Sequence, residues 1–144
     1  AAKGEWHTPR LMDTLGGDST VDDTKALDTI RLKDPKNWDK MFNAMDAVIT
    51  SYKGTARSLG HNLNFTMAAK TGTSQVVSIA QHEEYDSETI AERNRDHALF
   101  VAFAPVENPT IAIAVIVENG ESAGRTAGPV AKAVMQEYLL GAQG

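Results

Sequence analysis

Two apolar stretches separated by only five residues constrain the fold more than any other feature of the sequence. The first covers Ala98–Ala104 and the second Thr110–Glu118, and the link between them begins and ends with proline. Each stretch has the length and composition of a strand, and a link this short joins antiparallel neighbours. Ile111–Val117 is apolar at every position. That run predicts a strand in the interior of a sheet, covered on both faces.

Two further segments have the apolar spacing of helices. The first is predicted over Pro35–Thr50, with Asp34 as its N-cap, because apolar residues recur there every three or four positions. The second is predicted over Pro129–Leu140, between Gly128 and Gly141. Its packed face is expected to consist of the apolar residues at helical spacing, namely Val130, Ala133, Val134 and Tyr138.

A third strand is predicted from Phe65 to Val77, and a short helix from Glu88 to Arg95. The main elements therefore follow the order helix, strand, strand, strand, helix. This order predicts an α+β fold in which helices pack on an antiparallel sheet. The 144 residues are enough for one domain or for a part of one.

Composition excludes several classes of protein. Hydrophobic residues make up 42% and charged residues 23%, as in soluble globular domains rather than disordered chains. The formal net charge of −5 does not favour a nucleic-acid-binding surface. Cysteine is absent, so disulfides and thiolate metal sites are excluded. The apolar runs are far shorter than the roughly 18 residues of a membrane span. The chain starts with Ala1 and has no signal peptide, which suggests a processed chain or a fragment.

Three motifs that resemble catalytic or binding signatures are rejected. The four histidines lack metal-ligand spacing, so no metal site is predicted. The stretch from Gly120 to Gly124 matches the G-x-S-x-G nucleophile elbow, but no histidine follows Ser122, so a flexible glycine-rich loop is expected instead. Lys70-Thr71 lacks the glycine-rich loop that a phosphate-binding loop requires upstream.

Lys70-Thr71-Gly72 has a different meaning because it lies on a predicted strand and is followed by Thr73. Glycine lets a ligand approach the backbone closely, and lysine supplies a positive charge. The two threonines occupy alternate positions of the strand and therefore point to the same side. These features indicate a site for a carboxylate-bearing ligand laid along a strand edge. An ordinary exposed strand end explains them equally well.

The context of this tripeptide resembles a known family. Residues 69–75 (A-K-T-G-T-S-Q) are similar to the third motif of penicillin-binding proteins and serine β-lactamases. The likeness to the elongation-specific class B group, penicillin-binding protein 2, extends over roughly residues 35–140. Its further motifs are Gly54-Thr55-Ala56, Ile90–His97, Ala102–Pro105 and Val117–Gly120.

The resemblance implies a partial penicillin-binding/serine β-lactamase-like transpeptidase fold. It also implies a D,D-transpeptidase that cross-links peptidoglycan stem peptides at D-Ala-D-Ala termini through a serine acyl-enzyme. β-Lactams would acylate the same serine, and no cofactor is implied. Proteins of the cell-elongation machinery would be partners, and nucleic acid would not. The parent protein would be anchored in the inner membrane through a segment outside this chain, with its catalytic domain in the periplasm.

Roles for four residues follow from the resemblance. Lys70 would supply positive charge and support the proton network around the nucleophile. The hydroxyls of Thr71 and Thr73 would bind the terminal carboxylate of the substrate, and Gly72 would let the substrate approach the strand. The backbone N–H of Thr73 would be one of two oxyanion donors; loss of such a donor costs on the order of 3 kcal/mol in other acyl-transfer enzymes.

The sequence departs from the family pattern in one respect. None of its seven serines begins S-x-x-K or S-x-N, the motifs of the nucleophile and the proton relay. Residues 1–144 are therefore expected to be the C-terminal portion of the domain, inactive alone, with Thr110–Val117 left as an uncovered apolar edge. Two alternatives stay open: a non-catalytic penicillin-binding or sensor module, and a relative of the serine β-lactamases.

Overall fold

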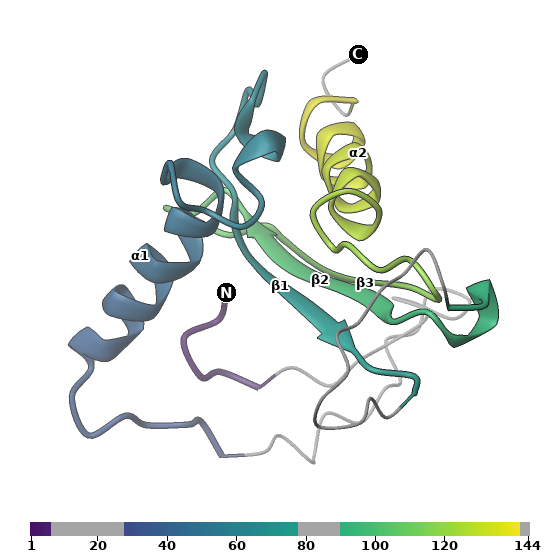
Figure 1. Ribbon diagram of the computed structural model, residues 1–144. Coiled ribbons are helices and arrows are strands. Elements are labelled where there is room, and N and C mark those ends of the chain that lie inside the picture. Colours follow the sequence, from purple (N-terminus) through teal and green to yellow (C-terminus); the bar gives the residue numbers. More distant parts are fainter. Residues whose placement is uncertain (7–27, 78–89, 142–144) are drawn as a thin grey trace, which may run out of the picture. The chain divides into compact units, whose positions relative to one another are not determined.

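The computed structural model describes residues 1–6, 28–77 and 90–141 (Figure 1). The chain divides into two compact units, residues 2–39 and residues 40–144, and Ala1 groups with the second. The described helices and strands follow the predicted order of helix, three strands, helix. In chain order they are α1 (Lys36–Thr50), β1 (Ala68–Ser74), β2 (His97–Ala104), β3 (Ile111–Val117) and α2 (Ala127–Leu140).

The smaller unit contains the start of α1. The Asp34 carboxylate accepts a hydrogen bond from the backbone N–H of Lys36 at 3.0 Å, so Asp34 caps the first turn as predicted, although the helix begins at Lys36, one residue after the predicted start at Pro35. Elsewhere in this unit the Ile30 N–H donates to the Gly4 carbonyl at 2.9 Å.

The sheet is antiparallel with the strand order β1-β2-β3, as the short connection predicted (Figure 1). β1 is shorter than the predicted strand from Phe65 to Val77. At one end, Ser74 pairs with His97, the first residue of β2. The residues after Ser74 therefore have no β2 residue with which to pair. At the other end, the Thr66 hydroxyl accepts from the Val106 N–H at 2.9 Å instead of continuing the ladder. Strand length is therefore limited by the partner strand.

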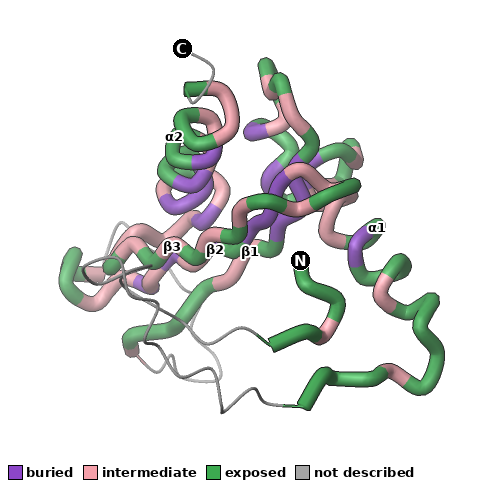
Figure 2. The backbone as a smooth tube through the Cα atoms, turned by 180° about the vertical axis from the view of Figure 1, so that it is seen from behind, coloured by how far each residue is buried: buried purple, intermediate pink, exposed green. Residues whose placement is uncertain are grey.

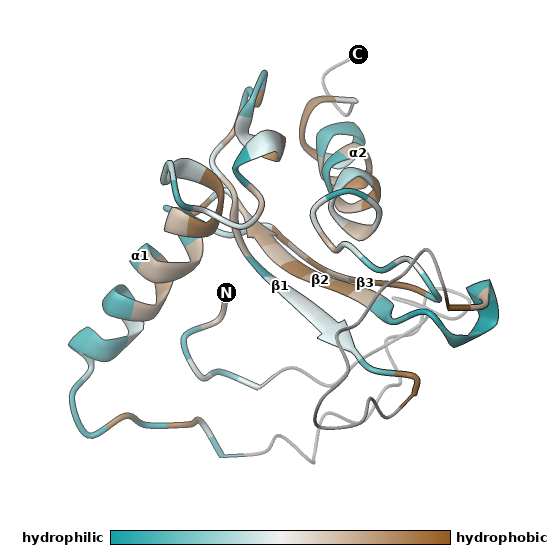
Figure 3. Ribbon diagram, viewed as in Figure 1, coloured by the Kyte–Doolittle hydropathy of each residue, from teal (hydrophilic) through white to brown (hydrophobic). Residues whose placement is uncertain are grey.

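β3 corrects the prediction of an interior strand covered on both faces. Among the described residues it pairs only with β2, and burial alternates along it. Ile111, Ile113, Val115 and Val117 pack against the core below α2. On the other face Ile116 is 65% exposed. Figure 3 shows that β3 is nevertheless strongly hydrophobic. A continuous apolar run therefore does not by itself establish two covered faces.

The main core lies between α2 and one face of the sheet. Met135 and Phe100 are fully buried there. Much of the interface is alanine, from both the sheet (Ala69, Ala98, Ala102, Ala104) and the helix (Ala127, Ala131), and none of these is more than 4% exposed. Side chains this small let a helix approach a sheet closely. Figure 2 shows the buried positions of α2.

The packed face of α2 differs from the predicted one. Val130, Val134 and Tyr138 are 48%, 47% and 56% exposed, and Ala133 is exposed as well. The buried positions are instead Ala127, Gly128, Ala131 and Met135. The prediction selected the larger apolar side chains, whereas close packing on the sheet selects the row of small ones. The helix also begins two residues before Pro129. Proline fits in the first turn because the backbone N–H groups there have no partner within the helix.

The opposite face of the sheet carries a smaller cluster. Phe42 of α1 packs against Phe103 of β2 with ring centroids 4.8 Å apart, in the tilted arrangement that aromatic pairs favour. Of the short helix predicted from Glu88 to Arg95, positions 88 and 89 lie outside the described residues. The remainder forms a single 3-10 turn, Glu92–Asn94.

Candidate functional site at the β1 edge

The predicted site residues, Lys70 to Thr73, lie together along the outer edge of β1 and are called the β1 strip below. Lys70 and Thr73 are exposed, and Thr71 and Gly72 are half-buried. Thr71 pairs with Phe100 and Thr73 with Ala98, so both threonines lie on the face that α2 covers. Lys70 is one position out of step with them and lies on the other face. No described strand pairs with the outer edge of β1, so a ligand along that edge can reach groups on both faces.

Lys70 and Gly72 shape the backbone of this strip. The Lys70 ammonium donates a hydrogen bond to the carbonyl of Thr71 at 2.5 Å, which holds the positive charge close to the strand. A Cβ at Gly72 would lie 3.3 Å from the Cβ of Leu99. A side chain there would be tight against β2 and would also extend into the space that a ligand needs.

A contact that sequence reasoning did not predict joins β1 to the loop after α1. The Thr55 and Thr71 hydroxyl oxygens are 3.0 Å apart. Thr55 belongs to the Gly-Thr-Ala segment that supported the family resemblance, which was the only signal of its importance in the sequence. A separation of 16 residues gives no periodicity from which the pairing could be read.

The loop between β3 and α2 is held in place by hydrogen bonds, in contrast to the flexible loop expected there. The Asn119 N–H donates to His97 Nδ1 at 3.0 Å, and the Asn119 amide donates to the Arg95 carbonyl at 2.9 Å. The Glu121 N–H donates to the Asp96 carbonyl at 2.9 Å. Within the loop, the Thr126 hydroxyl donates to the carbonyls of Gly120 and Ser122. The bonds from Asn119 and Glu121 tie the loop to residues 95–97 at the start of β2.

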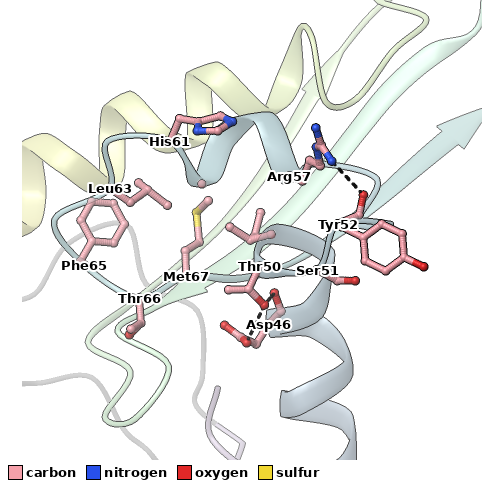
Figure 4. Close-up of a pocket in the computed structure, with 12 residues that line it drawn as sticks. Asp46, Thr50, Ser51, Tyr52, Arg57, His61, Leu63, Phe65, Thr66 and Met67 are labelled. Atoms are coloured by element: carbon pink, nitrogen blue, oxygen red, sulfur yellow. Dashed lines mark hydrogen bonds between the residues drawn. The ribbon is translucent and has the colours of Figure 1, made fainter.

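A cavity of about 530 Å³ lies near the C-terminal end of α1 and does not include the β1 strip. Leu63 and Met67 give it an apolar lining (Figure 4), to which Ile49 also contributes. Among its polar lining residues, Arg57 donates to the Tyr52 carbonyl at 3.2 Å (Figure 4). Within the described ranges no group of His, Asp and Glu side chains is arranged to hold a metal ion. No helix in this part of the chain is long and apolar enough to cross a bilayer.

Comparison with known sequences gives consistent matches. A sequence profile of the penicillin binding protein transpeptidase domain matches residues 1–136. The peptidoglycan D,D-transpeptidase MrdA of Acinetobacter baumannii is 49% identical over 105 residues, which are 73% of this chain and 15% of that protein. MrdA of Haemophilus influenzae is 32% identical over 138 residues, which are 94% of this chain and 21% of that protein. The chain thus spans about a fifth of the length of these relatives.

Solved structures with a similar fold include two proteins called PBP2. The Pseudomonas aeruginosa protein, solved in complex with WCK 5153, has a TM-score of 0.80 and 43% identity, and the match covers 96% of this chain and 27% of that one. The Helicobacter pylori protein, solved in complex with MreC, has a TM-score of 0.59 and 31% identity, with coverages of 78% and 20%. The two helices and three-stranded sheet are therefore similar to one part of a larger known fold.

Proposed function

The chain belongs to the transpeptidase-domain family of penicillin-binding proteins, within the penicillin-binding protein 2 (MrdA) group, and we propose that it is the C-terminal portion of the catalytic domain of a peptidoglycan D,D-transpeptidase. In this reaction a serine outside the chain attacks the carbonyl of the penultimate D-Ala of a stem peptide. The peptide C–N bond breaks, and the terminal D-Ala leaves as the protonated amine. The acyl group then passes to an amine of a second stem peptide. A β-lactam acylates the same serine by opening its ring.

The β1 strip supplies the binding wall in this proposal. The Thr71 and Thr73 hydroxyls donate hydrogen bonds to the terminal carboxylate of the substrate, and the Thr73 N–H is one of the two oxyanion donors. Lys70 contributes positive charge and supports the proton network around the serine. Gly72 leaves room for the substrate backbone beside β1.

The observation that carries the proposal is the exposed outer edge of β1. The motif residues are gathered on a strand whose outer side meets no other described strand, with both threonines on one face. An edge strand offers N–H and C=O groups to an extended peptide. A solved relative supports the ligand class: the Mycobacterium tuberculosis penicillin-binding protein A, 30% identical, was solved as a ceftriaxone acyl-enzyme.

Membership of the penicillin-binding protein 2 group also supports proposals for the partner and the location of the parent protein. The Helicobacter pylori complex with MreC supports a cell-elongation protein as a partner of the parent protein. The proposed location is the inner membrane, with the catalytic domain in the periplasm.

The test is the intact mass of the full-length protein under denaturing conditions, after incubation with benzylpenicillin. We expect the mass to rise by one covalently bound penicillin, and we expect no adduct on the 144-residue chain alone. Lys70→Ala in the full-length protein should slow adduct formation at least about tenfold, corresponding to a loss of about 1.4 kcal/mol or more of transition-state stabilisation. Lys33→Ala removes an exposed lysine outside the strip and is the matched control.

The two alternative functions give different results in this experiment. A non-catalytic penicillin-binding or sensor module would show no covalent adduct on the full-length protein. A serine β-lactamase relative would release the opened drug rapidly instead of retaining it. Either result would contradict the proposed transpeptidase.

A further inference from the structure

The Thr55–Thr71 contact joins two segments that are distant in the sequence. Thr55 lies in the loop after α1, and Thr71 lies in the middle of β1; their hydroxyl oxygens are 3.0 Å apart. Thr71 is half-buried, whereas Thr55 is exposed. An exposed threonine contributes little to a core, so the contact calls for an explanation other than packing.

The backbone around Thr55 is fixed on the side of α1. The Gly54 N–H donates to the Ser51 carbonyl at 2.9 Å, and the Ala56 N–H donates to the Val48 carbonyl at 3.1 Å. Ala56 is only 1% exposed. A Cβ at Gly54 would lie 2.3 Å from the Val48 carbonyl oxygen, so the loop lies directly against the end of the helix.

The backbone is also close-packed on the side of the loop between β3 and α2. A Cβ at Gly124 would lie 3.2 Å from the Thr55 carbonyl oxygen. The backbone of Thr55 is therefore confined between the end of α1 and this loop, and its hydroxyl lies 3.0 Å from the Thr71 hydroxyl on β1. A hydroxyl held in this way can orient the one beside it.

The direction of the hydrogen bond matters for any ligand at Thr71. A hydroxyl has one proton and two acceptor lone pairs. If Thr71 donates to Thr55, its proton is used and only lone pairs face the ligand, which repel a carboxylate. If Thr55 donates to Thr71, the Thr71 proton is free for the carboxylate. A chain of hydroxyls that ends on an anion is also strengthened by mutual polarisation.

We propose that Thr55 is a positioning residue that donates to Thr71, so that the Thr71 proton points at the ligand and ligands with a free carboxylate are selected. This inference rests on the proposed function, which places the substrate carboxylate beside Thr71. It assigns a role to the Gly-Thr-Ala loop that is separate from the motif on β1. Thr55 acts through Thr71 and does not touch the substrate.

The test measures the second-order rate constant for acylation of the full-length protein by two probes, benzylpenicillin and its methyl ester. Thr55→Val removes the hydroxyl and preserves the shape of the side chain. We expect it to slow acylation by benzylpenicillin about 3- to 10-fold, the range for the loss of one hydrogen bond between neutral groups, and to change the rate for the ester less than about twofold. Thr55→Ser should restore the rate with benzylpenicillin.

A matched control is Thr50→Val, the same substitution five residues earlier. The Thr50 hydroxyl donates to Asp46 within α1 and not to β1, so both rates should stay unchanged. Thr55→Ala gives the same comparison with a smaller side chain if valine disturbs the loop.

Three results overturn the inference. Equal rates for Thr55→Val and the wild type with benzylpenicillin would show that the hydroxyl has no effect. Equal losses with both probes would show a scaffolding role without selection of the carboxylate. If the wild-type protein forms no adduct at all, the proposed function fails first, and this outcome is distinct from the other two.

Discussion

Replacing Phe100 by alanine tests which face of β2 packs against α2. The pairing of β2 with β1 then fixes the face on which Thr71 and Thr73 lie. Phe100 is fully buried on the face covered by α2 and pairs with Thr71 on one side and Val115 on the other. Phe→Ala changes in cores cost about 3–5 kcal/mol, and complete burial places this site near 4 kcal/mol. For a domain of about 150–250 residues each kcal/mol lowers Tm by about 2–4 °C, which sets an upper limit of about 8–16 °C for the loss in the full-length protein, because the shift per kcal/mol is smaller in a larger folding unit.

The neighbouring residue provides the control for this prediction. Val101 is next on β2 but lies on the other face and is 43% exposed, so Val101→Ala should cost about 0.8 kcal/mol, or about 2–3 °C. Thermal unfolding of the full-length protein and both variants, followed by intrinsic fluorescence, measures the difference. Equal shifts, or a larger shift for Val101→Ala, would show that the assignment of faces on β2 is wrong.

Predictions for four further substitutions follow from individual contacts. Gly54→Ala should lower Tm by an amount equivalent to about 1–3 kcal/mol, because the added Cβ meets the Val48 carbonyl. Gly72→Ala should lower Tm less than Gly54→Ala does, but it should slow acylation by benzylpenicillin more. Lys132→Met should cost about 1.5–3 kcal/mol in chemical denaturation, because the ammonium donates to the carbonyls of Leu59 and His61 at 3.0 and 2.6 Å. The hydrogen bond from Thr66, assisted by a backbone N–H, lowers the pKa of Glu107 from 4.5. Because the folded-state pKa is the lower one, this stabilisation is present above pH 4.5 and is lost as pH falls through the folded value. Glu107→Gln should therefore have a slightly lower Tm than the wild type at pH 7, and the difference in Tm should shrink as the pH falls below 4.5; a constant difference would contradict the assignment.

The order and pairing of the main elements could be predicted because they depend on local signals. Asp34 caps α1 as expected, and the short link with two prolines does join antiparallel strands. The faces were predicted less well. The apolar run of β3 and the large apolar residues of α2, such as Val134, indicated burial that the fold does not provide. Which of two apolar faces is buried depends on the partner surface, and a single sequence does not contain that information.

The candidate site was predictable only where its residues are contiguous. Lys70 to Thr73 form one stretch, and strand alternation places Thr71 and Thr73 on a common face. The hydroxyl contact from Thr55 requires that the end of α1 and the middle of β1 meet, which depends on long-range packing. The hydrogen bonds that hold the loop from Asn119 to Thr126 also come from distant segments, and a glycine-rich sequence alone suggested flexibility.

The alanine interface between α2 and the sheet limits how the site can adapt. Ala69 and Ala98 lie on the inner face of the two strands nearest the strip and are fully buried, so a larger residue at either position adds volume inside the core. Overpacking of this kind typically costs about 1–3 kcal/mol. Under selection by an inhibitor, substitutions on the face of β1 that packs against α2 are therefore poorly tolerated. Tolerated changes in affinity should arise along the exposed rim, where a new side chain meets solvent.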